Sequence, residues 1–134
     1  MQGEFGEFIK QRRKSQGITL RGMAEGLDIA PAFMCDIEKG HRYPPNKEKL
    51  YEMARILQLN EEETNMMFDL AARERENYVS QDISGYIMSN DKARVALRLA
   101  RNNNTSDKTW QRIIEILENE ETEQGRDDPQ LHTR

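Results

Sequence analysis

The side chains best suited to chemistry lie between Thr19 and Arg42, and the chemistry they favour is binding of a phosphate backbone. Arg21 and Arg42 carry guanidinium groups, whose charged N–H groups form strong hydrogen bonds with phosphate. Thr19 can cap the start of a predicted helix, where unpaired backbone N–H groups attract an anion, although capping alone also explains this residue. Lys39 and His41 add two basic side chains just before Arg42.

Metal binding and catalysis are less well supported by the residue pattern. The two histidines, His41 and His132, have no second histidine or cysteine at the spacing of a metal site. Cys35 has no evident base that would activate it as a nucleophile. The consecutive carboxylates 61–63 point in different directions on a helix, so they fit a favourable first helical turn better than a metal site. We therefore expect no enzyme, no cofactor and no metal.

Composition bounds the class of protein. The chain has 134 residues, of which 36% are apolar and 33% charged, enough for one domain with a core or for a small domain with an extension. No apolar run approaches the roughly 20 residues that span a bilayer. The start lacks the pattern of a secretory signal and the chain has a single cysteine, so we expect a cytoplasmic protein without disulfides.

The charge of the chain is distributed unevenly. Residues 1–57 hold ten Lys and Arg against eight Asp and Glu, net +2, whereas residues 58–134 hold ten against sixteen, net −6. This asymmetry suits a protein whose residues 1–57 face phosphates and whose acidic residues 58–134 face a different partner.

Two short helices joined by a tight turn must position the basic side chains. Asp28 interrupts the helical pattern, and Pro31 suits the first position of the second helix, because its missing N–H has no use there. Met34 and Ile37 then face inward. In the first helix, apolar residues recur at helical spacing at Leu20, Met23, Ala24 and Leu27.

This segment resembles the helix-turn-helix of phage-repressor-like (Xre/Cro) regulators. The resemblance rests on Ala24 in the first helix, Ile29 after the turn, Met34 and Ile37 under the second helix, and the run 36–40 at its end. It implies that the second helix reads the major groove of DNA. The sequence departs from the family pattern at Gly22 and Gly26 inside the first helix, and at Asp28, where the family usually has glycine.

The resemblance also implies roles for individual residues. Arg13 matches a helix-one arginine that pairs with the glutamate ending the recognition helix, here Glu38; the alternative for the basic run 10–14 is a solvated helix end. Few groups on the second helix can read guanine, and Phe33 is also interpreted as a core or dimer-interface aromatic. The residues implied to face bases are Pro31, Ala32, Phe33 and Asp36, and those implied to hold the backbone are Thr19, Arg21, Lys39, His41 and Arg42, with Lys47 and Lys49 extending the positive edge.

The helical pattern continues to the end of the chain and predicts an all-α fold. A first helix is expected over residues 4–16, and helices capped by Asn46 and Asn60 complete a five-helix repressor-like DNA-binding domain over residues 1–73. A helical C-terminal extension covers residues 74–118, and residues 119–134 are expected to form a disordered acidic tail. The buried side of the helix capped by Asn60 is expected to hold Met66, Met67, Leu70 and Ala71. The last helix is strongly amphipathic and carries Trp110, Ile113, Ile114 and Leu117 along one face.

The function that these features favour is a sequence-specific double-stranded DNA-binding transcriptional regulator, most simply a homodimeric repressor. The alternative is an antitoxin-type or inhibitor-type interaction protein. In both, the short helices of residues 80–118 must bury their apolar faces, because helices of this length are marginal alone. A fold-back onto the first domain, a homodimer and a groove for another protein all remain open.

Overall fold

The computed structural model describes residues 3–75 and 78–127, and its regular secondary structure in these ranges is entirely helical. The predicted all-α class is confirmed. The helices, in chain order, are α1 (Glu4–Ser15), α2 (Leu20–Leu27), α3 (Pro31–Lys39), α4 (Lys47–Ile56), α5 (Glu61–Glu74), α6 (Gln81–Ser89), α7 (Asp91–Asn103) and α8 (Asp107–Asp127).

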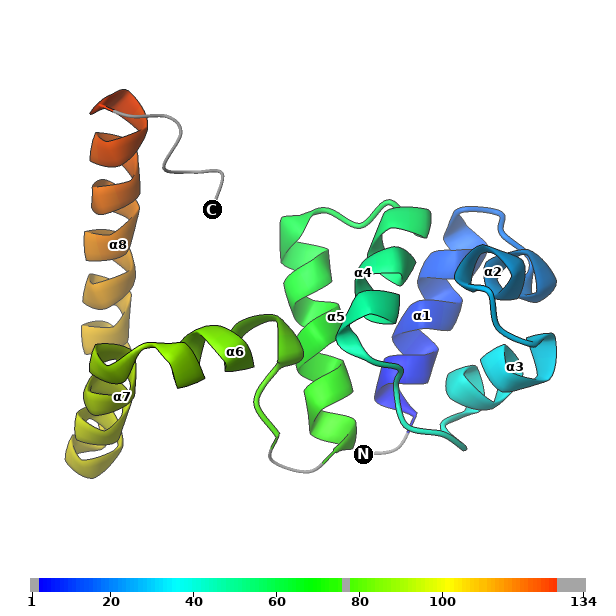
Figure 1. Ribbon diagram of the computed structural model, residues 1–134, viewed down its shortest axis with the longest axis horizontal. Coiled ribbons are helices and arrows are strands. Elements are labelled where there is room, and N and C mark those ends of the chain that lie inside the picture. The colour runs from blue at the N-terminus through cyan, green and yellow to red at the C-terminus, as the bar shows by residue number, and fades with distance from the viewer. Residues whose placement is uncertain (1–2, 76–77, 128–134) are drawn as a thin grey trace. The chain divides into compact units, whose positions relative to one another are not determined.

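The chain divides into two compact units, residues 1–89 and residues 90–134. In the first unit, α1 lies between α5 and the pair α2–α3, and contacts both α3 and α5 (Figure 1). The helices enclose one apolar core, to which each of α1–α5 contributes at least one fully buried side chain. The largest of these are Phe5, Ile9, Met23, Leu27, Met34, Ile37, Leu50, Met53, Leu57, Met67 and Phe68.

Polar side-chain caps fix where α2, α4 and α5 begin. The Thr19 hydroxyl accepts a hydrogen bond from the Gly22 N–H (2.9 Å), and the Asn46 side chain accepts one from the Lys49 N–H (2.9 Å). Asn60 forms a complete capping box with Glu63. Satisfied N–H groups stabilise a helix start by about 1 kcal/mol, and the caps predicted from the sequence are confirmed.

The turn between α2 and α3 depends on a left-handed residue. Asp28 ends α2 with φ 58° and ψ 46°, a conformation that Asp and Asn tolerate better than most residues with a side chain. It therefore takes the place of the family's usual glycine, and the turn into Pro31 is kept.

One predicted burial in α5 is wrong. We predicted an inward Met66, but its side chain is 53% exposed, whereas the neighbouring Phe68 is 1% exposed and belongs to the core. The buried stripe of α5 is thus rotated relative to the predicted one.

The first unit extends beyond the predicted boundary at residue 73. Ser80, which is buried, donates a hydrogen bond from its hydroxyl to the Asp69 carboxylate (2.5 Å), and α6 contacts α5. The contacts thus group α6 with the first five helices. The functional division of the chain into a DNA-binding domain (1–73), an extension (74–118) and a tail (119–134) stays a prediction.

In the second unit, α8 continues past its predicted end near Glu118 and runs to Asp127. The prediction of disorder from residue 119 is wrong for residues 119–127. Glu, Gln and Arg, which make up five of these nine residues, are good helix formers and extend a helix already nucleated by the apolar turns before it. Residues 128–134 lie outside the described residues.

Across the described ranges, every helix is either too short or too polar to cross a bilayer.

Gly6 permits a close approach of α1 to the end of α3. A methyl group on its α-carbon would lie 2.2 Å from the Glu38 carbonyl oxygen and 2.7 Å from that of Ile37. Both are backbone atoms, which cannot move aside as a flexible side chain can. Glycine at position 6 therefore sets the distance between α1 and α3.

The substitution Gly6→Ala should lower the free energy of unfolding. Alanine is favoured over glycine in a helix by up to about 1 kcal/mol, but overpacking at the α1–α3 contact should cost about 1–3 kcal/mol. Chemical denaturation measures the difference. Gly85→Ala in α6, where no atom lies within 4 Å of the added methyl group, is the matched control and should be neutral or stabilising. Equal effects of the two substitutions would contradict this account.

Candidate nucleic-acid interface

Helix α3 presents one face to the core and the other to solvent. Met34, Ile37 and Glu38 are buried. On the opposite face, Ala32 and Phe33 are exposed, with Phe33 exposed over 38% of its surface. Pro31 and Asp36, also predicted to face bases, are half-buried at the edges of this face. The residues predicted to read DNA thus lie together along one accessible strip of α3.

A buried ion pair holds the far end of α3. Arg13 donates from Nε to Glu38 Oε2 (2.7 Å) and from Nη2 to Glu38 Oε1 (3.0 Å), a bidentate arrangement. A third hydrogen bond runs from Arg13 Nη1 to the Ile18 carbonyl (2.9 Å), just before the capping residue of α2. One side chain of α1 thereby fixes the start of α2 and the end of α3.

The pair is well shielded from water. The side chains of Arg13 and Glu38 are 9% and 5% exposed. The hydrogen bonds with Glu38 raise the pKa of Arg13 above its ordinary value, against the opposing effect of burial. A raised pKa means that stability from the charged guanidinium would be lost only as the pH rises through that value, so it is fully present at neutral pH.

At the start of α2, Thr19 and Arg21 are exposed. The Thr19 hydroxyl takes the Gly22 N–H, which leaves other first-turn N–H groups of α2 without an intrahelical partner. A helix start of this kind, with an arginine beside it, is chemically suited to a phosphate oxygen.

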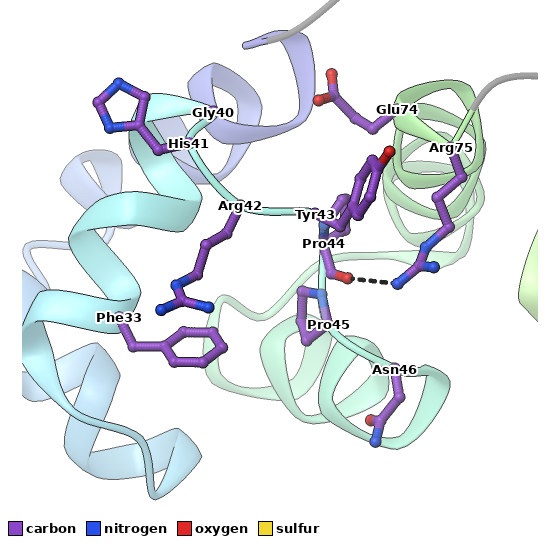
Figure 2. Close-up of a pocket in the computed structure, with 10 residues that line it drawn as sticks. All are labelled: Phe33, Gly40, His41, Arg42, Tyr43, Pro44, Pro45, Asn46, Glu74 and Arg75. Carbon is purple, nitrogen blue, oxygen red and sulfur yellow. Dashed lines mark hydrogen bonds between the residues drawn. The ribbon is translucent and has the colours of Figure 1, made fainter.

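A sharp chain reversal follows α3. Gly40 has φ 80°, and the His41 N–H donates to the Asp36 carbonyl (2.9 Å), which closes the helix end with a left-handed glycine cap. The chain then turns back, and the Arg42 guanidinium lies 4.4 Å from the centre of the Phe33 ring (Figure 2). Arg42 Nε is 3.7 Å from Asp36 Oδ2, and His41 Nδ1 is 4.0 Å from Asp36 Oδ1.

The three lysines predicted along the positive edge differ in their surroundings. Lys39 and Lys47 are exposed, as the predicted positive edge requires. The ammonium group of Lys49 instead donates to the Leu27 carbonyl and lies 3.7 Å from Glu52 Oε1. Lys49 therefore links α4 to the end of α2, and the prediction that it extends the positive edge is wrong.

Sequence reasoning missed a second cation beside the reversal. Arg75, next to the end of α5, donates from Nη2 to the Pro44 carbonyl (3.2 Å) and lies 5.2 Å from the Tyr43 ring centre (Figure 2). Together with Phe33 and Arg42, these residues line a hollow of about 470 Å³. No local pattern links residue 75 to this loop, because the two meet only after α4 and α5 have packed.

In the part of the chain that the structure describes, no three His, Cys, Asp or Glu side chains gather closely enough to hold a metal ion. The chemistry available at this surface is hydrogen bonding, charge and apolar contact.

The comparison with protein families identifies the fold around this surface. Residues 9–63 match the model of the Helix-turn-helix family HTH_3. This stretch is therefore a helix-turn-helix domain of the Xre/Cro-like kind, and the resemblance noted in the sequence is confirmed. A domain of this family supports a DNA-binding regulator.

Two further comparisons concern individual proteins. A solved structure titled as a complex of the SinR protein and the SinI protein shares 19% sequence identity with this chain. The likeness covers 88% of this chain and 98% of that one, with a TM-score of 0.44. None of the curated proteins matches the chain.

Removing one partner of the buried pair should destabilise the first unit strongly. Arg13→Met leaves the Glu38 carboxylate buried and unpaired, which should lower the free energy of unfolding by about 3–5 kcal/mol. The double variant Arg13→Met with Glu38→Leu should recover most of the loss, because no charge is then left buried. Chemical denaturation measures both.

Arg12→Met is the matched control for this prediction. Arg12 pairs with Glu63 at 2.9 Å, but its side chain is 40% exposed. An exposed pair contributes about 0–1 kcal/mol, so this variant should unfold nearly as wild type does. A loss at Arg13 no larger than the loss at Arg12 would refute the structural role of the Arg13–Glu38 pair.

Proposed function

We propose that this protein is a homodimeric repressor that binds double-stranded DNA through the exposed strip of α3. The observation that carries the proposal is the two-sided character of α3. Its inner face is buried in the core and held by Arg13 and Glu38, while its outer face is accessible and bordered by cations at both ends. A rigid, exposed helix flanked by positive charge is suited to the major groove.

The backbone contacts of this proposal lie on either side of α3. Thr19 and Arg21 at the start of α2 are suited to one phosphate group, and Lys39 at the end of α3 to another. Among the described residues, neither Arg21 nor Lys39 forms an ion pair, so these two cations are available to DNA. Such contacts set the register of the protein on the duplex but carry no sequence information.

Base contacts from α3 itself are mainly apolar. Ala32 and Phe33 are suited to the methyl group of thymine, as apolar side chains in the major groove are. Asp36 is an acceptor for a cytosine amino group, although its carboxylate already faces His41 and Arg42. Sequence-dependent DNA shape is expected to add to this limited direct readout.

The homodimer is supported by the apolar side chains of the second unit. Helix α7 has no buried residue, and Val95 and Leu99 on it are 54% and 56% exposed. On α8, Ile114 and Leu117 are 46% and 56% exposed. Exposed apolar stripes of this extent are typical of helices that pack against a partner. A second copy is the simplest partner, because a two-fold dimer suits paired half-sites one helical turn apart.

A repressor is the simplest regulatory output of such a dimer, since it needs only to occupy a promoter. The second candidate function is an antitoxin-type or inhibitor-type protein, in which residues 80–118 bind another protein. It is favoured by the few hydrogen-bonding groups on the outer face of α3 and by the same exposed stripes on α7 and α8.

Binding to the DNA upstream of the protein's own gene should depend steeply on salt. Each neutralised phosphate contributes a slope of about −0.9 to the plot of log affinity against log salt concentration. Arg21→Gln and Lys39→Gln should each reduce the slope by roughly one phosphate contact, as measured by fluorescence anisotropy across a salt series. Arg101→Gln on α7 serves as the control and should keep the wild-type slope. Affinity that does not change with salt would end the DNA-binding proposal.

The assembly should dissociate when charge is placed on the apolar stripes. Leu99→Asp combined with Leu117→Asp should convert a dimer into a monomer, as measured by sedimentation or light scattering of the full chain. Arg101→Gln combined with Arg112→Gln makes the same change in net charge at positions turned away from these stripes, and should leave the dimer intact. A wild-type chain that is monomeric at all concentrations would contradict the homodimer and favour the second candidate function.

A further inference from the structure

We propose that Arg42, which lies outside α3, is the residue that reads a guanine in the major groove. The inference rests on the proposed function, namely that α3 binds DNA. It addresses a gap in that function, because the exposed strip of α3 carries no side chain able to donate two hydrogen bonds to a guanine edge.

The chain reversal after α3 brings Arg42 back to the exposed side of that helix. Gly40 adopts φ 80°, and the hydrogen bond from the His41 N–H to the Asp36 carbonyl (2.9 Å) turns the chain back along the helix. The Arg42 guanidinium then stacks on Phe33, 4.4 Å from the ring centre, on the exposed side of α3 (Figure 2). A residue that follows the recognition helix in sequence thereby returns to the face of that helix.

Contacts on two sides hold the guanidinium in position. Phe33 lies beneath its plane, and the Asp36 carboxylate lies 3.7 Å from its Nε. Together with Ile29 and Ile37, Phe33 lines an apolar hollow of about 220 Å³. A stacked arginine loses less freedom on binding than a free one, and its planar fork keeps a fixed direction.

The groups needed to read guanine remain available. The Arg42 side chain is 52% exposed, and within residues 3–75 and 78–127 no hydrogen bond is formed by its two terminal nitrogens. These two nitrogens match the O6 and N7 acceptors of guanine, the commonest specific contact of arginine in the major groove. Asp36 occupies the Nε side and so leaves the terminal pair for the base.

The alternative role for Arg42 is a phosphate contact, and Asp36 argues against it. A phosphate group at Arg42 would approach the Asp36 carboxylate, and two like charges at such short range repel. The guanine edge is neutral and meets no such repulsion. Lys39 and Arg21, which form no ion pair with a carboxylate in the part of the chain that the structure describes, are better suited to phosphate.

Binding-site selection from a randomised duplex library, with the full chain, tests the assignment. Wild type should select sites with a guanine at one fixed position of each half-site. Arg42→Lys keeps the charge but loses the fork, so preference for guanine at that position should fall about tenfold while the salt slope is unchanged. Phe33→Leu removes the stacking surface that positions Arg42 and should weaken the same preference, again without a change in salt slope.

A modified base gives a second readout that does not depend on protein folding. Replacing the selected guanine by 7-deazaguanine removes the N7 acceptor and should lower wild-type affinity about tenfold, but leave the affinity of Arg42→Ala unchanged. Arg21→Lys is the matched control, and should retain the wild-type base preference. Thermal unfolding confirms that each variant is folded.

Four results would overturn the assignment. An Arg42→Lys protein with the wild-type base preference, or an Arg42→Ala protein weakened equally on all sequences with a smaller salt slope, would make Arg42 a phosphate contact and leave the proposed function standing. Selected sites without a fixed guanine would also reject it. A wild-type chain with no salt-dependent DNA binding would reject both the assignment and the proposed function.

Discussion

The ion pair between Arg13 and Glu38 is the constraint on which the proposed interface depends. Its two charges are almost completely removed from water, so their attraction is largely offset by the cost of desolvation. The benefit is geometric, because the pair and the Ile18 carbonyl bond tie α1, the start of α2 and the end of α3 together. Once these three points are fixed, the outer strip of α3 has one orientation. The Thr19 cap, the turn at Asp28 and the exposed cations then have fixed positions relative to this strip.

The overall charge of −4 does not conflict with DNA binding, because charges act locally. In salt solution a charge is screened beyond roughly 8–10 Å, so a phosphate at α3 is sensitive mainly to the cations around that helix. Most of the excess acid lies in residues 58–134, and in α5 the carboxylates 61–63 serve the first turn of the helix. At the candidate interface, the Asp36 carboxylate faces His41 and Arg42 and partly neutralises their charge.

Helix periodicity and capping residues predicted the fold well, because both are local signals, and the caps lie where the side chains indicated. The sequence places the buried face of α5 one residue too early, with Met66 inward where the structure buries Phe68. A short apolar run fits two neighbouring rotations of a helix, so periodicity alone cannot choose between them. At the candidate site, residue types identified the exposed strip of α3, but not the stacking of Arg42, which depends on the left-handed Gly40. Nor could composition show that Lys49 turns inward, because its acceptor is a backbone carbonyl on another helix.

The contact at Gly6 limits how this protein can change over evolutionary time. Its neighbours are the carbonyl oxygens of Ile37 and Glu38, so a larger residue would displace the end of the recognition helix itself. Gly85 has open space around it and carries no such restriction. Natural variants that keep this fold should therefore retain glycine at position 6 while position 85 drifts freely, and a homologue with a larger residue at the first position should show a compensating shift in how its two helices cross.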